Sequence, residues 1–268
     1  MREEQMAAPV KSRAIVLRRY ALGETSRVVV CYTRDYGKVR FAAKGARKGG
    51  GRVGAALDPF VVSGVIFYLR DPRVLSLVSQ AEPEREFRDL RRDVTRQAHA
   101  AVALELVDRL VADGAPDPEL FDDVCRTLSA LDDAPEEELG PLLWAFELTL
   151  AERLGYSPEL DRCCVCGGPA GSAGFSVEAG GVVCEGCGRE ASDFGPDVVE
   201  FLRALRSGGV VQRPASSRLA DEVGRAIRGL LERHSGLELK LRSQAVLNSL
   251  ARASRAQGSG ARRRKEEN

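Results

Sequence analysis

The stretch TSRVVVCYTRDYGKVRFAAK, residues 25–44, decides the fold class of this chain. Its first half is rich in β-branched and aromatic side chains, which favour a β-strand. Asp35-Tyr36-Gly37 then predicts a tight turn. In the second half, apolar and polar side chains alternate, so Val39 and Phe41 share one face while Lys38 and its basic neighbours share the other. The stretch therefore predicts a β-hairpin whose second strand has one apolar and one basic face.

Further strands are expected on both sides of this hairpin. A glycine-rich segment over residues 45–54 predicts a loop, and Gly64 indicates a bulge or bend within a later strand. Five short strands within about 70 residues predict a small barrel of the OB type, a fold often used to bind single strands. The five expected strands cover residues 13–20, 25–33, 38–44, 60–69 and 74–81.

From residue 82 onward the apolar side chains recur with helical spacing. Asp117-Pro118 is an N-cap followed by proline at the first helical position, and Gly155 is placed to end a later helix. The expected helices cover residues 96–112, 117–131, 136–154, 196–207, 218–234 and 243–256.

These patterns predict an α+β protein: an N-terminal five-stranded OB-type β-barrel followed by an α-helical domain with an inserted Cys₄ zinc element. The predicted divisions are an OB-fold domain over residues 1–81, an acidic helical domain over 82–160, a zinc-binding element over 161–192, C-terminal helices packing on the helical domain over 193–256, and a disordered basic tail over 257–268.

The composition excludes some classes of protein and conceals a strong charge asymmetry. The 268 residues contain no apolar run of the length that a membrane span needs, and the N-terminus lacks the apolar stretch of a signal peptide. We therefore expect neither membrane insertion nor export, and a cytoplasmic location. The net charge of +1 is the sum of +9 over residues 1–80, −12 over 81–160 and +4 over 161–268. Such segregation indicates separate domains with different partners.

The positive charge is concentrated between residues 11 and 52, where twelve cations face only Glu24 and Asp35. Clustering of this kind is typical of a surface that binds a polyanion, although a solvated strand face is the alternative. No recognition-helix pattern accompanies the cations, so contacts to phosphates rather than to bases would dominate. Aromatic side chains that could stack on bases, unless they are part of the core, are Tyr32, Tyr36, Phe60, Phe67 and Tyr68.

Two Cys-x-x-Cys pairs lie seventeen residues apart in the sequences CCVCGG and CEGC. This spacing is typical of a four-thiolate zinc site, because one tight turn aims two sulfurs at the same tetrahedral ion. Disulfides are disfavoured by the absence of an export signal and by the odd total of seven cysteines. Cys164 competes with its neighbour as first ligand, but a single intervening residue gives a poorer turn. We therefore predict one structural Zn²⁺ ion held by Cys163, Cys166, Cys184 and Cys187, and simple burial for Cys31 and Cys125.

Several segments together resemble the RecO family of bacterial DNA repair proteins. They run in order through roughly residues 11–250, and the set as a whole is more specific than any one piece. The matching segments are RAIVLRRYALGETSRVVVCYTRDYGKVRFAAKGARK at 13–48, ELFDDVCRTLSAL at 119–131, FELTLAERLGYSPELDRCCVCGG at 146–168, GGVVCEGC at 180–187 and LLERHSGLELKLRSQAVLNSL at 230–250.

This resemblance implies a recombination mediator of the RecF pathway. Members of the family bind single- and double-stranded DNA, anneal complementary strands, and work with RecR and single-strand binding protein to load RecA. Some members lack the four cysteines, which supports a structural role for the zinc. The family's DNA surface is its basic OB domain, which implies a DNA-binding role here for Arg13, Arg18, Arg19, Arg27, Arg34, Lys38, Arg40, Lys44, Arg47 and Lys48.

Two other classes of function remain as alternatives. A zinc-ribbon regulatory protein could use the same basic domain to bind RNA or a polymerase. An enzyme is disfavoured, because no paired carboxylates, nucleophile motif, P-loop or open metal site stands out. The acidic helices could shield the basic domain, orient it on DNA or dock basic partners, or they could be ordinary solvated faces.

Overall fold

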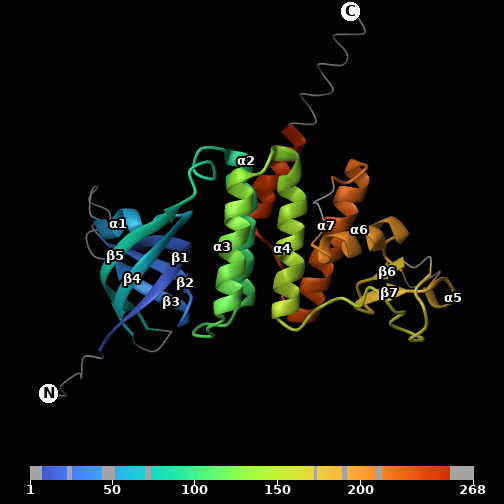
Figure 1. Ribbon diagram of the computed structural model, residues 1–268, viewed down its shortest axis with the longest axis horizontal. Helices are drawn as coiled ribbons and strands as arrows, with labels where there is room; N and C mark the ends of the chain where they lie inside the picture. The colour runs from blue at the N-terminus through green and yellow to red at the C-terminus, as the bar shows by residue number, and fades with distance from the viewer. Residues whose placement is uncertain are drawn as a thin grey trace, which may run out of the picture.

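The computed structural model describes residues 8–22, 26–43, 52–69, 74–171, 174–188, 192–208 and 213–253. Figure 1 shows three parts arranged in a row: a β-barrel, a group of helices in the middle, and a small element with two short strands at the far end. This arrangement confirms the predicted α+β class and the order of its parts. The predicted tail over 257–268 lies outside the described residues.

The N-terminal part is a closed barrel with the strand order β1-β2-β3-β5-β4. β3 and β5 pair in parallel, while β1 pairs antiparallel with β2 and with β4 and thereby closes the barrel. The predicted OB-type architecture is confirmed. The elements are β1 (Pro9–Leu22), β2 (Ser26–Thr33), β3 (Gly37–Ala43), the short helix α1 (Arg52–Ala56), β4 (Val61–Tyr68) and β5 (Ser76–Glu86).

The interior of the barrel is a separate apolar cluster. Phe41 and Phe67 are fully buried there, with their ring centroids 4.9 Å apart in an edge-to-face arrangement. Cys31 lies in the same cluster, as predicted from its apolar strand, and burial raises the pKa of its thiol. The predicted apolar face of β3 is therefore the face that fills the barrel.

The predicted end of the last strand was wrong. The sequence placed it at Ala81 and expected helical structure from residue 82, but β5 continues to Glu86. Residues 82–86 are charged or proline, and glutamate and proline have a low propensity for strands. They are held extended by pairing with β4, and Pro83 lies opposite Ser63 next to a register shift, a position where a missing N–H is tolerated. Tertiary hydrogen bonding thus overrides local propensity.

The outer surface of the barrel is also partly buried. Ile15 pairs with Tyr32 on one side and with Val62 on the other, and all three belong to the apolar cluster of the helices. The Tyr32 ring lies 6.2 Å from that of Phe121. Because both faces of β2 and of the middle of β1 are covered, Val28–Tyr32 and Ala14–Val16 are continuous apolar runs rather than alternating ones.

The helical part begins where two aspartates cap its first helices. Asp93 accepts from the backbone N–H groups of Thr95 and Arg96, and Asp117 accepts from Leu120, so the predicted cap at Asp117 is confirmed. The helices are α2 (Val94–Leu110), α3 (Pro118–Asp133), the 3₁₀ turn η1 (Glu136–Glu138), α4 (Leu139–Arg153), α6 (Pro196–Arg206) and α7 (Ser217–Ser235), and residues 242–253 are also helical.

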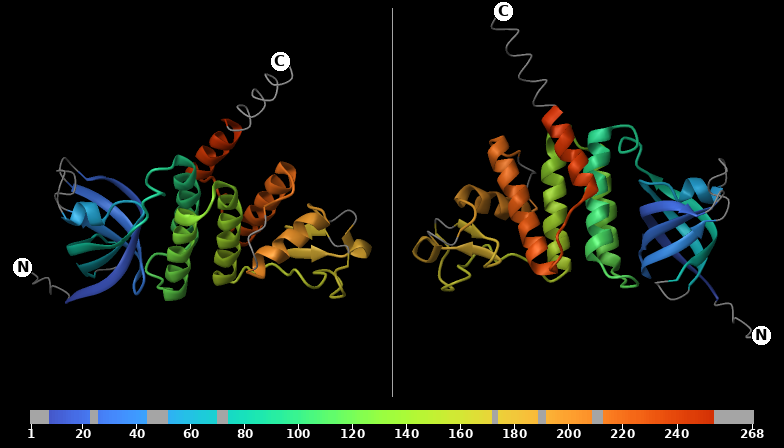
Figure 2. Two further views of the ribbon diagram at one scale, coloured as in Figure 1. Left: turned by 45° about the horizontal axis from the view of Figure 1, so that its top comes forward. Right: turned by 180° about the vertical axis from the view of Figure 1, so that it is seen from behind.

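The last helical segment folds back onto the middle of the molecule. Glu105 of α2 accepts hydrogen bonds from the backbone N–H groups of Arg242 and Ser243, and Gln244 accepts one from Arg228 of α7. The view from behind in Figure 2 shows this segment, in red, beside α2. Within the described ranges, no helix combines the length and apolar composition needed to cross a membrane.

Candidate functional site

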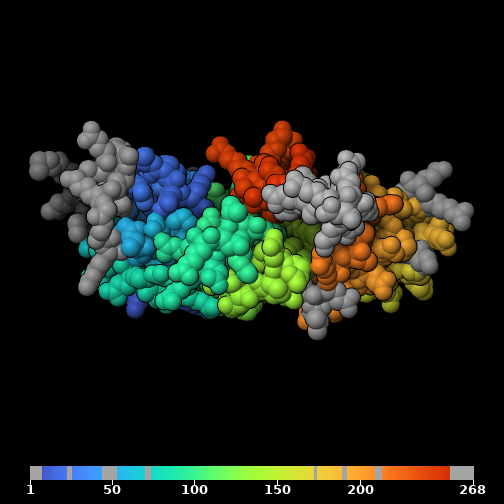
Figure 3. All heavy atoms as spheres, turned by 90° about the horizontal axis from the view of Figure 1, so that it is seen from above, coloured from blue at the N-terminus to red at the C-terminus, as the bar shows by residue number. Residues whose placement is uncertain are grey.

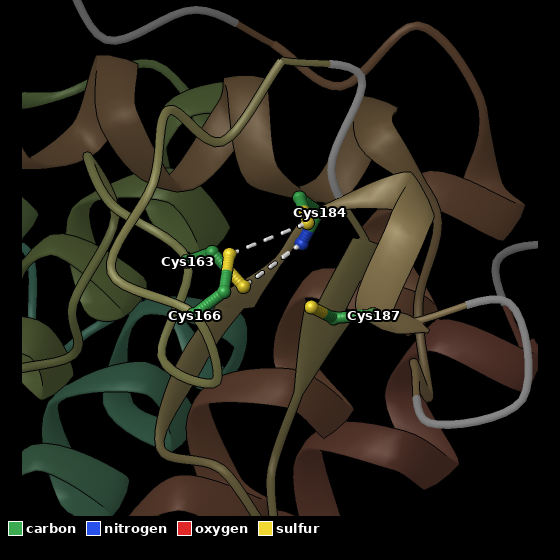
Figure 4. Close-up of side chains that lie close together, drawn as sticks. All are labelled: Cys163, Cys166, Cys184 and Cys187. Carbon is green, nitrogen blue, oxygen red and sulfur yellow. Dashed lines mark hydrogen bonds between the residues drawn. The ribbon is translucent and has the colours of Figure 1, made fainter.

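Four cysteine side chains converge at the end of the molecule opposite the barrel. The Sγ atoms of Cys163, Cys166, Cys184 and Cys187 all lie within 4.8 Å of one another. Figure 4 shows them pointing toward one another from two segments, the turn that carries the first pair and the start of α5 (Glu185–Gly188). The predicted pairing of the two Cys-x-x-Cys sequences is thus present in space.

The local backbone explains why these sulfurs converge. In the first pair, Gly167 adopts a φ of +69°, a value that favours glycine, and its N–H donates to the carbonyl of Cys163. The backbone N–H of Cys184 donates to Cys163 Sγ at 3.3 Å, and that of Val165 donates at 3.4 Å. The N–H of Cys184, followed by that of Cys166, lowers the pKa of Cys163 to about 6. A thiol stabilised as thiolate is the form that ligates a metal.

Cys164 lies outside this group. Its position shows which of the two adjacent cysteines, Cys163 or Cys164, belongs to the candidate metal site. Its side chain is exposed and its backbone N–H donates to the carbonyl of Val182. Desolvation is the first cause that raises the pKa of its thiol, the opposite direction from Cys163. Cys163 is therefore the first member of the four-cysteine group.

The geometry fits a tetrahedral metal ion. Four sulfurs at about 2.3 Å from one zinc ion lie about 3.8 Å apart. The Sγ atoms of Cys166 and Cys184 are 3.8 Å apart. Four thiolates fill a tetrahedral shell and leave no open position for a substrate, which is the donor set of a structural site.

The cysteine group lies next to a small sheet that packs on the helices. The sheet pairs β6 (Gly174–Ser176) with β7 (Gly181–Val183), just before the second cysteine pair. Phe175 and Val182 from these strands are buried in the apolar cluster of the helices, and Glu178 forms an ion pair with Arg233 of α7. A metal at this site would therefore fix how the C-terminal sheet packs on α6 and α7.

The predicted DNA-binding cations that the structure describes do not form one open surface. Lys44, Arg47 and Lys48 lie outside the described residues. The other seven all form ion pairs, and those pairs divide them into two groups. Arg13, Arg18, Arg34, Lys38 and Arg40 have partners in the helical part, whereas Arg19 and Arg27 have a partner in the barrel itself.

Lys38 is the most deeply buried of these cations, with a side chain that is 8% exposed. Its Nζ donates to the carbonyl of Asp108 at 2.7 Å and lies 3.3 Å from the carboxylate of Asp113. Arg40 donates to the same Asp113 carboxylate at 2.7 Å. Next to them, a Cβ added to Gly37 would lie 2.4 Å from the carbonyl oxygen of Ala115, so this turn requires glycine. The start of β3 is thus an interface with the loop after α2, where sequence alone indicated an open basic face.

A second contact joins the barrel to α3. Arg34 donates two hydrogen bonds to Asp122, at 3.2 and 2.9 Å, in a bidentate arrangement. The hydrogen bond from Arg34 is the first cause that lowers the pKa of Asp122. Arg13 pairs with Glu84 at 2.9 Å and lies 4.0 Å from Asp122. The acidic helices therefore neutralise part of the basic barrel.

Arg19 and Arg27 lie together at the end of the barrel near α1. Both guanidinium groups contact the carboxylate of Asp58, which follows α1, and Arg91 contacts it from the segment after β5. These three arginine side chains remain between 32% and 42% exposed. Seven of the predicted cations lie in the part of the chain that the structure describes. Of these seven, Arg19 and Arg27 are the two whose ion pairs involve no acid of the helical part.

Comparison with known proteins identifies the family. A family model described as "Recombination protein O N terminal" matches residues 6–87, and one described as "Recombination protein O C terminal" matches residues 91–243. The chain belongs to the RecO family of DNA repair proteins. The resemblance noted in the sequence is confirmed.

Curated members of the RecO family match along most of the chain. The protein named "DNA repair protein RecO" from Anaeromyxobacter dehalogenans is 37% identical over 87% of this chain and 94% of its own length. The protein of that name from Rubrobacter xylanophilus is 36% identical over 84% of this chain and 92% of its own. The one from Exiguobacterium sibiricum is 32% identical over 90% and 96%. The alternative of a zinc-ribbon regulatory protein is not favoured.

The sequence patterns did not indicate two features of the surface. Tyr20 on β1 is 48% exposed, whereas the predicted stacking residues Tyr32 and Phe67 are buried in the core. The run RDLRR at residues 88–92 carries three arginines, but it lies within a region whose net charge is −12. A shorter counting window would have found the run, because a regional average hides a local cluster.

Proposed function

We propose that this RecO-family chain is a non-enzymatic recombination mediator. It binds single- and double-stranded DNA, anneals complementary strands, and helps to load RecA onto DNA coated with single-strand binding protein, with RecR as a further partner. It acts in the cytoplasm, in association with the nucleoid. The observation that carries the proposal is an OB-type barrel bearing many cations in a chain that belongs to a family of DNA repair proteins.

Annealing on this surface requires no catalytic residue. Two complementary strands repel one another through their phosphates, and cations that bind both strands lower this repulsion. The interaction is electrostatic, and each phosphate contact releases counterions. Because Lys38 is buried against Asp108 and Asp113, we assign it to the joint between barrel and helices. Arg19, Arg27 and the exposed Arg18 are better placed to contact phosphates.

We further propose that the four cysteines hold one structural Zn²⁺ ion. The donor set is all thiolate, the sulfurs have tetrahedral spacing, and no substrate position remains. When bound, the ion crosslinks the two cysteine turns. The chain's own residues then hold the C-terminal sheet against α6 and α7.

The decisive experiment is strand annealing by the purified protein, with complementary oligonucleotides that are either bare or coated with single-strand binding protein. We expect faster annealing than without protein under both conditions. Affinity for a single-stranded oligonucleotide should fall linearly on a log–log plot against salt, with a slope of about −0.7 per phosphate contact.

Failure to anneal under both conditions would exclude the mediator function. Affinity that stays constant between low and high salt would exclude the basic surface as its cause. Nuclease activity with Mg²⁺ would contradict the non-enzymatic assignment. Recovery of RNA polymerase without any annealing would favour the regulatory alternative.

A further inference from the structure

The segment that follows β5 brings additional arginines to the barrel end near α1. We propose that Arg19, Arg27 and Arg91, gathered around Asp58, form a binding site for the phosphodiester backbone of single-stranded DNA. The site extends over the RDLRR run at residues 88–92. This proposal rests on the DNA-binding function proposed above and adds residues that the sequence did not assign.

Three guanidinium groups from segments distant in sequence meet at one carboxylate. Arg19 of β1 donates to Asp58 Oδ1, which also lies 3.9 Å from Arg27 of β2. Arg91 lies 3.8 Å from Asp58 Oδ2 and 3.6 Å from Glu86. A guanidinium group carries five N–H donors, so one that contacts a carboxylate through a single edge retains donors for a phosphate.

The charge of the neighbourhood is positive. Arg88 and Arg92 flank Arg91 in the same turn and are exposed. Asp89 and Asp93 accompany these two arginines, so the excess of positive charge comes from the ion-paired group itself. There, the three guanidinium groups of Arg19, Arg27 and Arg91 share two carboxylates, those of Asp58 and Glu86. At the joint with the helices, Asp108, Asp113 and Asp122 form ion pairs with the other five predicted cations that the structure describes.

The segment that carries Arg91 is fixed at both ends. Phe87 donates from its backbone N–H to the carbonyl of Phe60, and the backbone N–H of Leu90 donates to Asp132 at 2.7 Å. The side chains of Phe87 and Leu90 are fully buried. Figure 3, which looks down on this side of the molecule, shows the chain after β5 next to α1 at the surface. A preformed cluster on anchored backbone costs little ordering entropy when a ligand binds.

The backbone near Asp58 is strained. Phe60 adopts a φ of 59°, a left-handed conformation that is uncommon for a bulky residue. Its carbonyl accepts the N–H of Phe87, so this conformation ties the segment containing Asp58 to the segment containing Arg91. Strain of this kind concentrates at functional sites.

The test compares three variants of the full chain by binding to a fluorescently labelled single-stranded oligothymidylate over a range of salt concentrations. Arg91→Gln removes one cation without adding an acid beside Asp58. We expect it to weaken binding about three- to tenfold and to reduce the salt slope by about 0.7. Arg218→Gln, an exposed arginine of α7, is the matched control and should change affinity less than twofold.

Asp58→Asn tests the site in the opposite direction. It removes a negative charge while keeping the shape of the side chain, so the site should bind the oligonucleotide at least about twofold more tightly. A merely structural ion-pair cluster predicts loss of stability without any gain in affinity. Thermal unfolding of each variant, measured beside its affinity, distinguishes a binding site from a merely structural cluster.

The outcomes distinguish this site from the function on which it rests. If wild-type protein binds in a salt-dependent way but Arg91→Gln equals the Arg218→Gln control, the Asp58 site is excluded while the proposed function stands. If Asp58→Asn binds no more tightly than wild type, the site is excluded as well. If wild-type protein does not bind the oligonucleotide, both proposals fall.

Discussion

The barrel and the cysteine element lie at opposite ends of the molecule and are held together in different ways. The barrel closes through strand pairs that are distant in sequence, such as β1 with β4 and β3 with β5, around a fully buried apolar interior. The cysteine element has two three-residue strands and four sulfurs supplied by residues 163–187. A two-stranded sheet of this length is not stable by itself in water.

The two parts obtain their stability from different sources. The barrel depends on removing apolar surface from water, whereas the cysteine element depends on ligation and on docking against the helices. The two parts should therefore respond independently to changes at their own centres.

Cys184→Ser should abolish metal binding. Removing one of four thiolates opens the tetrahedral shell, so the zinc content should fall from about one ion per chain to none. Protease cleavage between residues 162 and 188 should increase, while oligonucleotide binding by the barrel is retained. Zinc measured by atomic absorption, together with limited proteolysis, checks the result.

Cys164→Ser is the matched control, because this neighbouring thiol lies outside the four-cysteine group. It should keep its zinc. Equal zinc loss in both variants would contradict the ligand set, and loss of oligonucleotide binding in Cys184→Ser alone would contradict the independence of the two ends.

Phe67→Ala should destabilise the barrel. The ring is fully buried against Phe41 and Tyr36, and removing it leaves a cavity. The free energy of unfolding should fall by about 3–5 kcal/mol in urea denaturation, with the zinc content unchanged. Leu77→Ala, on a side chain of β5 that is 40% exposed, should change it by less than about 0.5 kcal/mol. A loss of zinc in Phe67→Ala at concentrations of urea too low to unfold the chain would show that the two ends are coupled.

Glu147→Gln should increase stability at alkaline pH. Glu147 of α4 is fully buried beside Arg228, and desolvation raises its pKa to about 7. As pH rises from the usual carboxyl range toward 7, the unfolded chain loses this proton first, so the folded state loses stability. Glutamine cannot ionise but can still accept from Arg228. Above pH 7 the variant should be more stable by up to about 3 kcal/mol, and the difference should vanish below about pH 4.5.

Urea denaturation of both proteins at pH 5 and pH 8 measures this effect. Acidification also protonates thiolates and releases metal, but that loss is common to the two proteins and cancels in their difference. A difference in stability that is the same at both pH values would show that the carboxyl of Glu147 does not titrate in this range.

The sequence was most informative where local chemistry decides the structure. The spacing of Cys163, Cys166, Cys184 and Cys187 predicted their convergence, because a Cys-x-x-Cys turn aims its sulfurs whatever surrounds it. The cap at Asp117 and the alternation around Phe41 were equally local and were confirmed.

The sequence was least informative about which side chains from different elements lie against one another. It counted Lys38 and Arg40 as part of an open basic strand face, but it could not show that Asp113 lies against them. It averaged Arg91 into an acidic region, although in space this residue joins Arg19 and Arg27 of the barrel. It also ended β5 at Ala81, because pairing with β4 is not encoded in the propensities of residues 82–86.

The amino-acid sequence by itself determined the α+β class, the barrel, the four-cysteine group and the family, because period, turn chemistry and ligand spacing are properties of short segments. Only the tertiary structure decided which cations remain available to a partner. Charge on a surface depends on the acids that folding brings within a few ångströms of it, and those acids come from helices up to about 90 residues away along the chain.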